Sequence, residues 1–399
     1  MTEVFRRLRF LLVCAATLAF LPIVPVQAAT FNVIHAFTGG GDGGYPAYGT
    51  LIRDAQGNFY GSMGIPTVFG AVYEMSPHGS VTILYTFNGH GGAGPDGLIL
   101  DKKGNLWGPA CCGGGKSDCG VVFKLTSNGD ETPVHRFTGA PRDGCLPYAA
   151  LIIGKNRDLY GATGDGGKDN YGTVFEISAR GHEKVIHSFT GGKEGYYPFA
   201  ALTMDAQGNL YGVTVHGGGR ASAGVVFEMS ATGAETPLYD FKGSPNDGSL
   251  PDGTLILDAS GNIYGTTLGG GRAGCYAGLG CGVVFELAPD GTETVLHKFE
   301  AGKDDGANPV SGLIADSAGN LYGTTEYGGG RSPCNGANGC GTVFEIAADG
   351  TETVLHKFDQ RTDGANLAAG LVADGSGDYY GTTSQGGRYG YGTVFEISP

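Results

Sequence analysis

Short runs of β-branched and aromatic residues recur seven times along the chain, separated by glycine-rich segments. Such residues favour strands, and glycine favours the tight turns between them. In the sixth repeat the pattern predicts four strands, here named a to d in chain order. They are near Gly312–Asp316, Asn320–Thr325, Gly341–Ile346 and Thr353–Phe358.

The links between these strands are of two kinds. Asp-x-x-Gly-Asn between a and b, and Ala-Asp-Gly-Thr between c and d, predict tight hairpin turns with glycine at positive φ. Four-stranded units of this length, repeated seven times, predict an all-β, seven-bladed β-propeller, whereas a β-solenoid is the alternative.

The two ends of the chain predict how the ring closes. Phe31–Phe37 resembles a d strand without the strands that precede it, and Gly392–Ile397 is a c strand with no d strand after it. We therefore expect the N-terminal strand to complete the seventh blade. This closure would remove the open sheet edges that invite aggregation.

Composition narrows the class of protein. The chain has 76 glycines among 399 residues without a three-residue period, which excludes collagen. Charged residues are 16% and hydrophobic residues 41%, which excludes a disordered acidic chain. The net charge of −14 argues against nucleic acid as a partner. The chain is expected to be a monomer.

The N-terminus has the composition of a secretory targeting segment. A basic stretch at residues 6–9 precedes an apolar stretch at residues 10–21, which is too short to span a membrane. Small residues predict cleavage after Ala28. We expect residues 1–28 to be a signal peptide and residues 29–399 to be one propeller domain, without a membrane span, in the periplasm or outside the cell.

The repeated motifs carry a family resemblance. The frame GTVFEI…GTETVLHKF…DGA.P..GLI.D..GNLYGTT..GGG resembles the GloVer-type (Gloeo/Verruco) tandem repeat of secreted bacterial proteins. The resemblance covers nearly all of residues 29–399. It implies an extracellular or surface location and a propeller-like array, and it supplies no catalytic residues.

The long, variable b–c and d–a loops should emerge on one face of a propeller, where binding residues usually lie. Most b–c loops carry a cation after Gly-Gly, and most d–a loops carry an acid before glycine. The b–c loop of the first blade lacks the cation, and the d–a loop that follows it lacks the acid. This joint absence predicts an ionic latch between neighbouring loops, and a charged rim that binds a glycan is the alternative. The predicted pairs are Lys116 with Asp143, Lys168 with Glu194, Arg220 with Asp247, Arg272 with Asp305, Arg331 with Asp363, and Arg388 with Asp42.

Aromatic residues in or beside the same loops are the candidate ligand-binding residues, since such rings stack on sugars; packing against glycine-rich loops is the alternative. They are Tyr45, Tyr48, Tyr196, Tyr197, Tyr389 and Tyr391. A histidine recurs two residues before the Phe of strand d, but Tyr85 and Tyr239 replace it in two blades. Tyrosine replaces a hydrogen-bonding residue more readily than a metal ligand, so we expect no metal and no cofactor.

Eight cysteines follow residue 28, an even number that predicts disulfides in an oxidising compartment. Two b–c loops contain a cysteine pair together with an insertion, which predicts the local bridges Cys275–Cys281 and Cys334–Cys340. Cys119 is expected to pair with Cys112 or Cys111, and the other member of that doublet with Cys145.

Two classes of function remain after these exclusions. We expect a secreted, non-catalytic propeller that binds a glycan or a protein on its variable loop face, because the repeats supply no nucleophile motif or catalytic triad. The alternative is an extracellular carbohydrate-active enzyme, a lyase or a glycoside hydrolase, with its site on that face.

Overall fold

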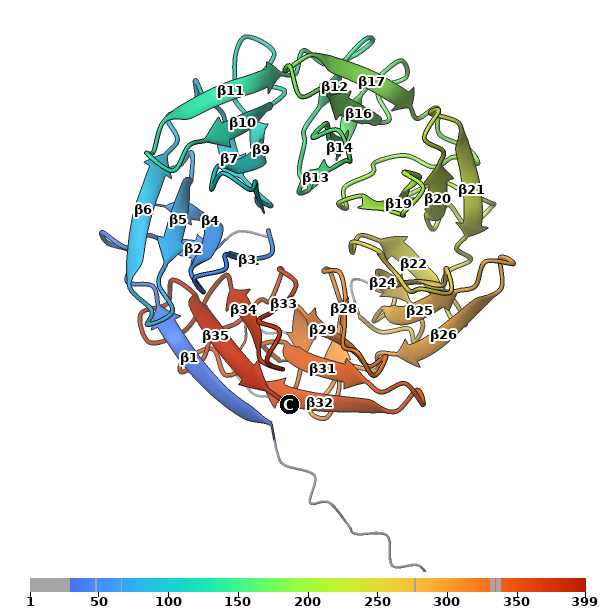
Figure 1. Cartoon of the computed structure of the whole chain (residues 1–399). Coiled ribbons are helices and arrows are strands. Elements are labelled where there is room, and N and C mark those ends of the chain that lie inside the picture. The colour runs from blue at the N-terminus through green and yellow to red at the C-terminus, as the bar shows by residue number, and fades with distance from the viewer. Residues whose placement is uncertain (1–28, 47–48, 66, 276–277, 331–333, 335–338) are drawn as a thin grey trace, which may run out of the picture.

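A computed structural model describes residues 29–46, 49–65, 67–275, 278–330, 334 and 339–399. Within these residues there is no α-helix, so none is long and apolar enough to cross a membrane. The strands form seven antiparallel blades arranged in a ring around a central axis (Figure 1). The chain is therefore an all-β, seven-bladed propeller with four main strands in each blade.

The short a strands lie nearest the axis and the d strands at the outer edge (Figure 1). The a strands are β3 (Ile52–Arg53), β8 (Ile99–Leu100), β13 (Ile152–Ile153), β18 (Thr203–Met204), β23 (Ile256–Leu257), β28 (Ile314–Ala315) and β33 (Val372–Ala373). The b strands are β4 (Phe59–Ile65), β9 (Leu106–Cys112), β14 (Leu159–Thr163), β19 (Leu210–Thr214), β24 (Ile263–Gly270), β29 (Leu321–Thr325) and β34 (Tyr379–Thr383).

The two outer strands of each blade vary little in length, with five to seven residues each. The c strands are β5 (Ala71–Met75), β10 (Val121–Leu125), β16 (Thr173–Ile177), β20 (Val225–Met229), β25 (Val283–Leu287), β31 (Thr342–Ile346) and β35 (Thr393–Ser398). The d strands are β6 (Val81–Thr86), β11 (Glu131–Arg136), β17 (Glu183–Ser188), β21 (Glu235–Asp240), β26 (Glu293–Lys298), β32 (Glu352–Lys357) and β1 (Thr30–Ala36). The four strands predicted in the sixth repeat are confirmed within two residues.

The ring closes as the sequence predicts. The N-terminal strand β1 pairs antiparallel with β35, with Thr30 opposite Ser398 and Ala36 opposite Thr393 (Figure 1). It is the outer strand of the seventh blade, in the sheet order β1-β35-β34-β33. This pairing leaves every c strand of the ring with a neighbour on both sides.

The hydrophobic core lies between neighbouring blades. At each of the seven junctions the Phe that follows a d strand packs edge-on against the c-strand aromatic of the next blade, with ring centroids 5.0–5.5 Å apart. Phe137 and Phe175 are an example, and both are almost completely buried. Each blade therefore supplies half of two cores, and no blade has a core of its own.

The glycine of the Tyr-Gly pair in strand b makes room for these rings. A Cβ on Gly161 would lie 2.6 Å from Cζ of Phe175, closer than any side-chain carbon can approach. The equivalent glycines of the other blades meet their own c-strand aromatic in the same way; they are Gly61, Gly108, Gly212, Gly265, Gly323 and Gly381. This close approach explains why Gly follows the aromatic residue in every repeat.

A β-bulge lies in every c–d pair. In the third blade Val174 faces His187 and Phe175 faces Val185, so Ile186 has no partner on strand c. Ile186 packs instead into the core of the next blade with Leu210. Bulges re-aim side chains locally, and this one places His187 beside Ile186 at the junction with the following blade.

The short turns satisfy their own polar groups. Asp316 in the a–b turn of the sixth blade accepts hydrogen bonds from the backbone NH of Ala318 and Asn320 at 2.8 and 2.9 Å, and from the Asn320 side chain at 2.8 Å. These bonds outweigh the effect of partial burial and lower the pKa of Asp316. The turn is an Asp-capped hairpin, and its geometry is complete without a cation.

Removal of the closing strand tests the architecture. A chain that begins at residue 38 lacks β1 and exposes the edge of β35, whereas a chain that begins at residue 29 keeps the strand. We expect the shorter chain to aggregate and to lose its cooperative thermal unfolding, because an unpaired edge strand recruits other chains. Size-exclusion chromatography and calorimetry of the two chains provide the comparison. Equal stability and monomeric behaviour of both would contradict the role of β1.

Candidate functional site

The d–a and b–c loops of each blade lie side by side on one face, as the sequence predicts. In the first, second and fifth blades the d–a loop adds a strand to the end of strand b: β2 (Gly44–Pro46), β7 (Ala93–Pro95) and β22 (Gly248–Pro251). In the third and sixth blades the two loops pair separately, β12 (Gly144–Cys145) with β15 (Asp165–Gly166) and β27 (Gly306–Ala307) with β30 (Tyr327–Gly328). Single bridges join the same loops in the fourth and seventh blades, Tyr196 to His216 and Ala365 to Gln385.

A cavity of about 760 Å³ occupies the centre of the ring. Its wall is built from the residues just before and within each a strand, in which small residues (glycine, alanine, serine and threonine) and aliphatic residues, chiefly leucine, occur in similar numbers. Leu268, in the last part of β24, and Glu326, just after β29, also line it on the side of the variable loops. The cavity is therefore the central channel of the propeller, with its wall continuing to the loop face.

Two aspartates lie among the small and aliphatic residues of the channel wall. Asp96 in the second blade and Asp252 in the fifth both follow a proline and both line the channel with partial exposure. Burial among protein atoms raises the pKa of Asp252 to about 6. Burial also raises the pKa of Asp96 to about 7, and the negative charge of Asp252 adds to the effect, although the backbone NH of Gly97 opposes it.

A third carboxyl group lines the same channel. Burial raises the pKa of Glu326, which follows strand β29. The corresponding residues after strand b in other blades are Cys111, Val215 and Leu268. The channel therefore brings together three carboxyl groups, each of which takes up a proton more readily than an aspartate or glutamate in water.

Our sequence analysis missed these carboxyl groups, although a signal for them exists. The residue after the proline that precedes strand a is Tyr148, Phe199 or Val310 in three other blades, and Asp96 and Asp252 stand out only when the repeats are aligned at this position. The alignment cannot show that the two lie close enough to affect each other. Only the ring places the second and fifth blades across one narrow channel.

A line of aromatic rings leads from the loop face into the channel. Tyr171 lies 5.2 Å from Tyr196, which lies 4.9 Å from Tyr197. Tyr197 stacks on Phe199 at 5.8 Å, and Phe199 meets Tyr148 at 5.4 Å. Tyr171 is 37% exposed, and the last two rings line the channel. The structure thus brings the predicted residues Tyr196 and Tyr197 into contact with the channel wall, and we call these five residues the aromatic path.

The other predicted aromatic residues form a separate group. Tyr45 lies 5.3 Å from Tyr391 at the junction of the seventh and first blades, and the Arg388 guanidinium lies 5.4 Å from the ring centre of Tyr389. Tyr45 and Arg388 line a shallow surface hollow of about 580 Å³, and Tyr389 is 48% exposed. Tyr48 lies outside the described residues.

The predicted ionic latch is wrong where the described residues test it. The acids of the d–a loops pair with the histidine of the preceding d strand, as in His35–Asp42 at 3.1 Å and His356–Asp363 at 2.7 Å. Among the described salt bridges none joins Lys116, Lys168, Arg220 or Arg388 to its predicted acid, and Arg272 pairs with Glu300 at 2.6 Å. Arg331 lies outside the described residues.

A local hydrogen bond explains the difference. Each acid turns back to accept the backbone NH that follows the d-strand Phe; for example, Thr138 NH donates to Asp143 at 2.7 Å and Lys242 NH donates to Asp247 at 2.7 Å. The carboxylate is then held against its own strand and points away from the loop that carries the cation. In the fourth blade Tyr239 takes the place of histidine and donates to Asp247 at 2.9 Å.

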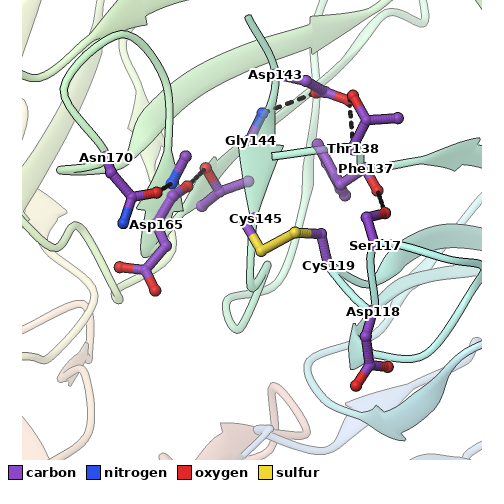
Figure 2. The surroundings of a disulfide bond; sticks show 12 residues. Ser117, Asp118, Cys119, Phe137, Thr138, Asp143, Gly144, Cys145, Asp165 and Asn170 are labelled. Atoms are coloured by element: carbon purple, nitrogen blue, oxygen red, sulfur yellow. Dashed lines mark hydrogen bonds between the residues drawn. A yellow bond between two sulfur atoms is a disulfide. The ribbon is translucent and has the colours of Figure 1, made fainter. Parts of the chain in front are cut away.

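Three disulfides are described, and two of them are as predicted. Cys275–Cys281 and Cys334–Cys340 each close a single b–c loop. The third prediction is wrong, because Cys119 pairs with Cys145 (Figure 2). Cys111 and Cys112 are free thiols whose sulfurs lie 2.9 Å apart.

Contact between loops decides this pairing. Cys119 precedes strand β10, and its carbonyl accepts the backbone NH of Leu146 in the following d–a loop at 2.9 Å. The same contact recurs at other blades, for example from Asn308 NH to the Cys281 carbonyl at 2.7 Å. Cys145 is next to Leu146, so its sulfur reaches Cys119, as Figure 2 shows. The bridge therefore reinforces a contact that the fold makes in any case.

Peptide mapping without reduction tests this framework. We expect a linked Cys119–Cys145 peptide pair in addition to the two local pairs, because the Cα atoms of Cys119 and Cys145 lie 4.4 Å apart. Mass spectrometry of the proteolysed, unreduced protein measures the linkage. Recovery of Cys119 joined to Cys112 would restore the local pairing and contradict the structure.

The channel carboxyl groups predict a dependence of stability on pH. Because the pKa of Asp96 is raised from 3.8 to about 7, the folded state binds a proton that the unfolded state releases, and the free energy of unfolding falls as pH rises from about 4 to 7. At pH 8 we expect the free energy of unfolding of Asp96→Asn to exceed that of the wild type by about 1 kcal/mol, so that the variant unfolds at a higher urea concentration. At pH 4 most of this difference should disappear.

Asp316→Asn is the matched control, since its carboxylate has a lowered pKa and its loss should destabilise the protein at pH 8. Urea unfolding of the three proteins at both pH values gives the comparison. A pH-independent effect of Asp96→Asn would show that this group is not protonated in the folded state.

Comparison with known proteins places the chain by its repeats and by its fold. The model of the Gloeobacter/Verrucomicrobia repeat matches residues 23–222 and 218–399. No match was found among curated proteins. Many solved structures share the fold.

Two of these structures come from bacterial surface systems. The extracellular domain of a putative one-component system from B. thetaiotaomicron has a TM-score of 0.57 at 9% identity, over 91% of this chain and 39% of that one. PorZ, a surface component of the type-IX secretion system of Porphyromonas gingivalis, has a TM-score of 0.54 at 11% identity, over 89% of this chain and 46% of that one. The chain spans less than half the length of either, and at these identities the likeness shows the fold alone.

A putative gluconolactonase has a TM-score of 0.45 at 16% identity, over 74% of this chain and 88% of that one. This score is too low to support an argument about activity. The two repeat matches, which together span residues 23–399, agree with the seven blades of the structure. The chain belongs to the Gloeobacter/Verrucomicrobia repeat family.

Proposed function

We propose that this propeller binds a glycan on its variable loop face, with the sugar chain lying along the aromatic path and ending in the central channel. The observation that carries the proposal is the continuous line of rings from Tyr171 at the surface to Tyr148 in the channel wall. Flat aromatic faces pack against the CH groups of sugar rings, and tyrosine also offers a hydroxyl to the sugar.

The channel supplies the polar groups that such a ligand needs. Its wall carries Asp96, Asp252 and Glu326 among small and aliphatic side chains, so that a sugar ring meets hydrogen-bond acceptors together with apolar surface. A cavity of about 760 Å³ lies in the range of small-molecule sites and is large enough for a few sugar rings. The raised pKa of Asp96 and Asp252 allows these groups to donate as well as accept near neutral pH.

We further propose that the protein acts outside the cytoplasm as one domain over residues 29–399. The N-terminal targeting pattern and the three disulfides support this location, since structural disulfides persist in oxidising compartments. The seven blades form one closed ring, which supports a single folding unit.

The alternative of a carbohydrate-active enzyme has one specific observation in its favour. Asp96 and Asp252 have pKa values of about 7 and 6, and a protonated carboxyl beside an ionised one is the arrangement of glycoside hydrolases. The two proposals share one site and differ in whether the bound glycan is cleaved.

A glycan array probed with residues 29–399 tests both proposals. We expect binding to a defined set of oligosaccharides, and a loss of about five- to thirtyfold in affinity for Phe199→Ala, because removal of a stacked ring costs about 1–2 kcal/mol. Titration calorimetry with the best oligosaccharide measures the change, and chromatography of the same mixture detects cleavage.

Two control variants keep the result specific. Tyr389→Ala removes an exposed ring beside the separate hollow, next to its lining residue Arg388, and Val68→Ala removes a side chain that is 90% exposed. Neither should alter affinity if the aromatic path is the site. Loss of binding in Tyr389→Ala but not in Phe199→Ala would move the site to the hollow, and an array without any bound glycan would refute the proposal.

A further inference from the structure

A group of three polar side chains recurs at the outer junctions between blades, away from the channel. One member is the histidine beside the bulge of a d strand, the second is the acid of the following d–a loop, and the third is the glutamate that begins the d strand of the next blade. The complete groups are His135, Asp143 and Glu183; His187, Glu194 and Glu235; and His297, Asp305 and Glu352. In each group one ligand atom from every residue lies within 4.8 Å of the other two.

The polar atoms of these groups face one another without all being hydrogen-bonded. Among the described residues, Oε1 of the glutamate that begins the d strand is buried without a hydrogen-bond partner at each of the five junctions that have one: Glu131, Glu183, Glu235, Glu293 and Glu352. Nε2 of His187 and His297 is also buried and without a hydrogen bond. Leaving a buried polar atom unsatisfied destabilises the folded state, and at the three junctions with a complete group a histidine and an acid lie beside the glutamate that carries it.

Histidine and acid are slightly farther apart in the complete groups than at the two histidine junctions without the glutamate. Where no glutamate is present, His35 and His356 form hydrogen bonds to their acids at 3.1 and 2.7 Å. In the three complete groups the closest ion-pair distances are 3.2, 3.5 and 3.4 Å, at His135, His187 and His297. At His187 and His297 the ligand atoms therefore lie close together without a hydrogen bond between histidine and acid, whereas His135 is hydrogen-bonded to Asp143.

A divalent cation at that point would satisfy all three residues. Neutral imidazole and two carboxylates supply one nitrogen and two oxygen ligands of the types that Zn²⁺ accepts, and their total charge of −2 balances the ion. Water completes a tetrahedral set, since the groups are only half-buried.

The acids are also held in place by other bonds, as metal ligands usually are. Asp143 accepts the backbone NH of Thr138 at 2.7 Å and of Gly144 at 2.7 Å (Figure 2), and Asp305 accepts the NH of Glu300 at 2.7 Å. We propose that each of these three blade junctions binds one divalent transition-metal ion of the Zn²⁺ type, which links neighbouring blades at the rim of the ring.

At two of the remaining four junctions tyrosine replaces histidine, and its hydroxyl forms hydrogen bonds to the neighbouring acids. Tyr239 donates its hydroxyl to Asp247 at 2.9 Å and lies 3.4 Å from Glu293, so one proton takes the place of the ion. Tyr85 contacts Glu131 at 3.2 Å in the same way. At the other two junctions Phe31 and Val81 occupy the position of the glutamate, opposite Ile397 and Met75 of strand c. The proposal therefore predicts three ions per chain, in contrast to the sequence-based expectation of no metal.

The test uses residues 29–399, stripped with a chelator and dialysed against Zn²⁺ at micromolar concentration. Elemental analysis should find three tightly bound zinc ions per chain, and zinc should raise the melting temperature of the stripped protein. Glu183→Gln, Glu235→Gln and Glu352→Gln should each lower the number by one, and the triple variant should bind none while keeping its circular dichroism spectrum.

Glu293→Gln is the matched control, because it changes the same position at a junction that has tyrosine in place of histidine. It should leave three ions bound. Substitution with Co²⁺ gives a second readout, since tetrahedral sites show intense visible absorption and weakly adsorbed ions do not. Absence of stoichiometric binding, or an unchanged number of ions in the triple variant, would overturn the proposal.

Discussion

The packing of one aromatic ring on the next blade is the contact on which the rest of the propeller depends. A blade buries little by itself, and its Phe after strand d becomes buried only when the c strand of the following blade lies against it. Glycine in strand b allows that ring to sit against the sheet. Since burial of a phenylalanine contributes about 2–3 kcal/mol and each blade takes part in two such contacts, the ring is stable as a whole and its open form is not.

This constraint separates the parts of the repeat that stay constant from those that vary. The b and c strands and their short turns form the contacts between blades, so each repeat keeps the same residues there. The channel wall and the long loops are not required for these contacts between blades. They are where the blades differ, with Asp96, Asp252 and Glu326 on the axis and the aromatic path beside them. The proposed binding site is thus built from the positions that the ring leaves free.

The junctions at the rim show a second use of the same repetition. Histidine, acid and glutamate come from two neighbouring blades, so none of the groups exists within a single repeat. Where tyrosine replaces histidine, its hydroxyl donates a hydrogen bond to the neighbouring carboxylates, as Tyr239 does to Asp247 and Glu293. The same position is therefore occupied by histidine at some junctions and by tyrosine at others. Junctions of one kind serve as a comparison for junctions of the other kind within one molecule.

The sequence by itself determined the features that depend on neighbours along the chain. The strands, the tight turns, the matching ends β1 and β35, and the short bridges Cys275–Cys281 and Cys334–Cys340 were all predicted, because spacing and residue type specify them locally. The tertiary structure alone decided which loop of one blade meets which loop of the next. It joined Cys119 to Cys145, turned the loop acids towards histidine instead of the cations, and set Asp96 across the channel from Asp252. Those choices depend on how closely and at what angle the blades pack, and that geometry arises only when seven aromatic contacts close the ring.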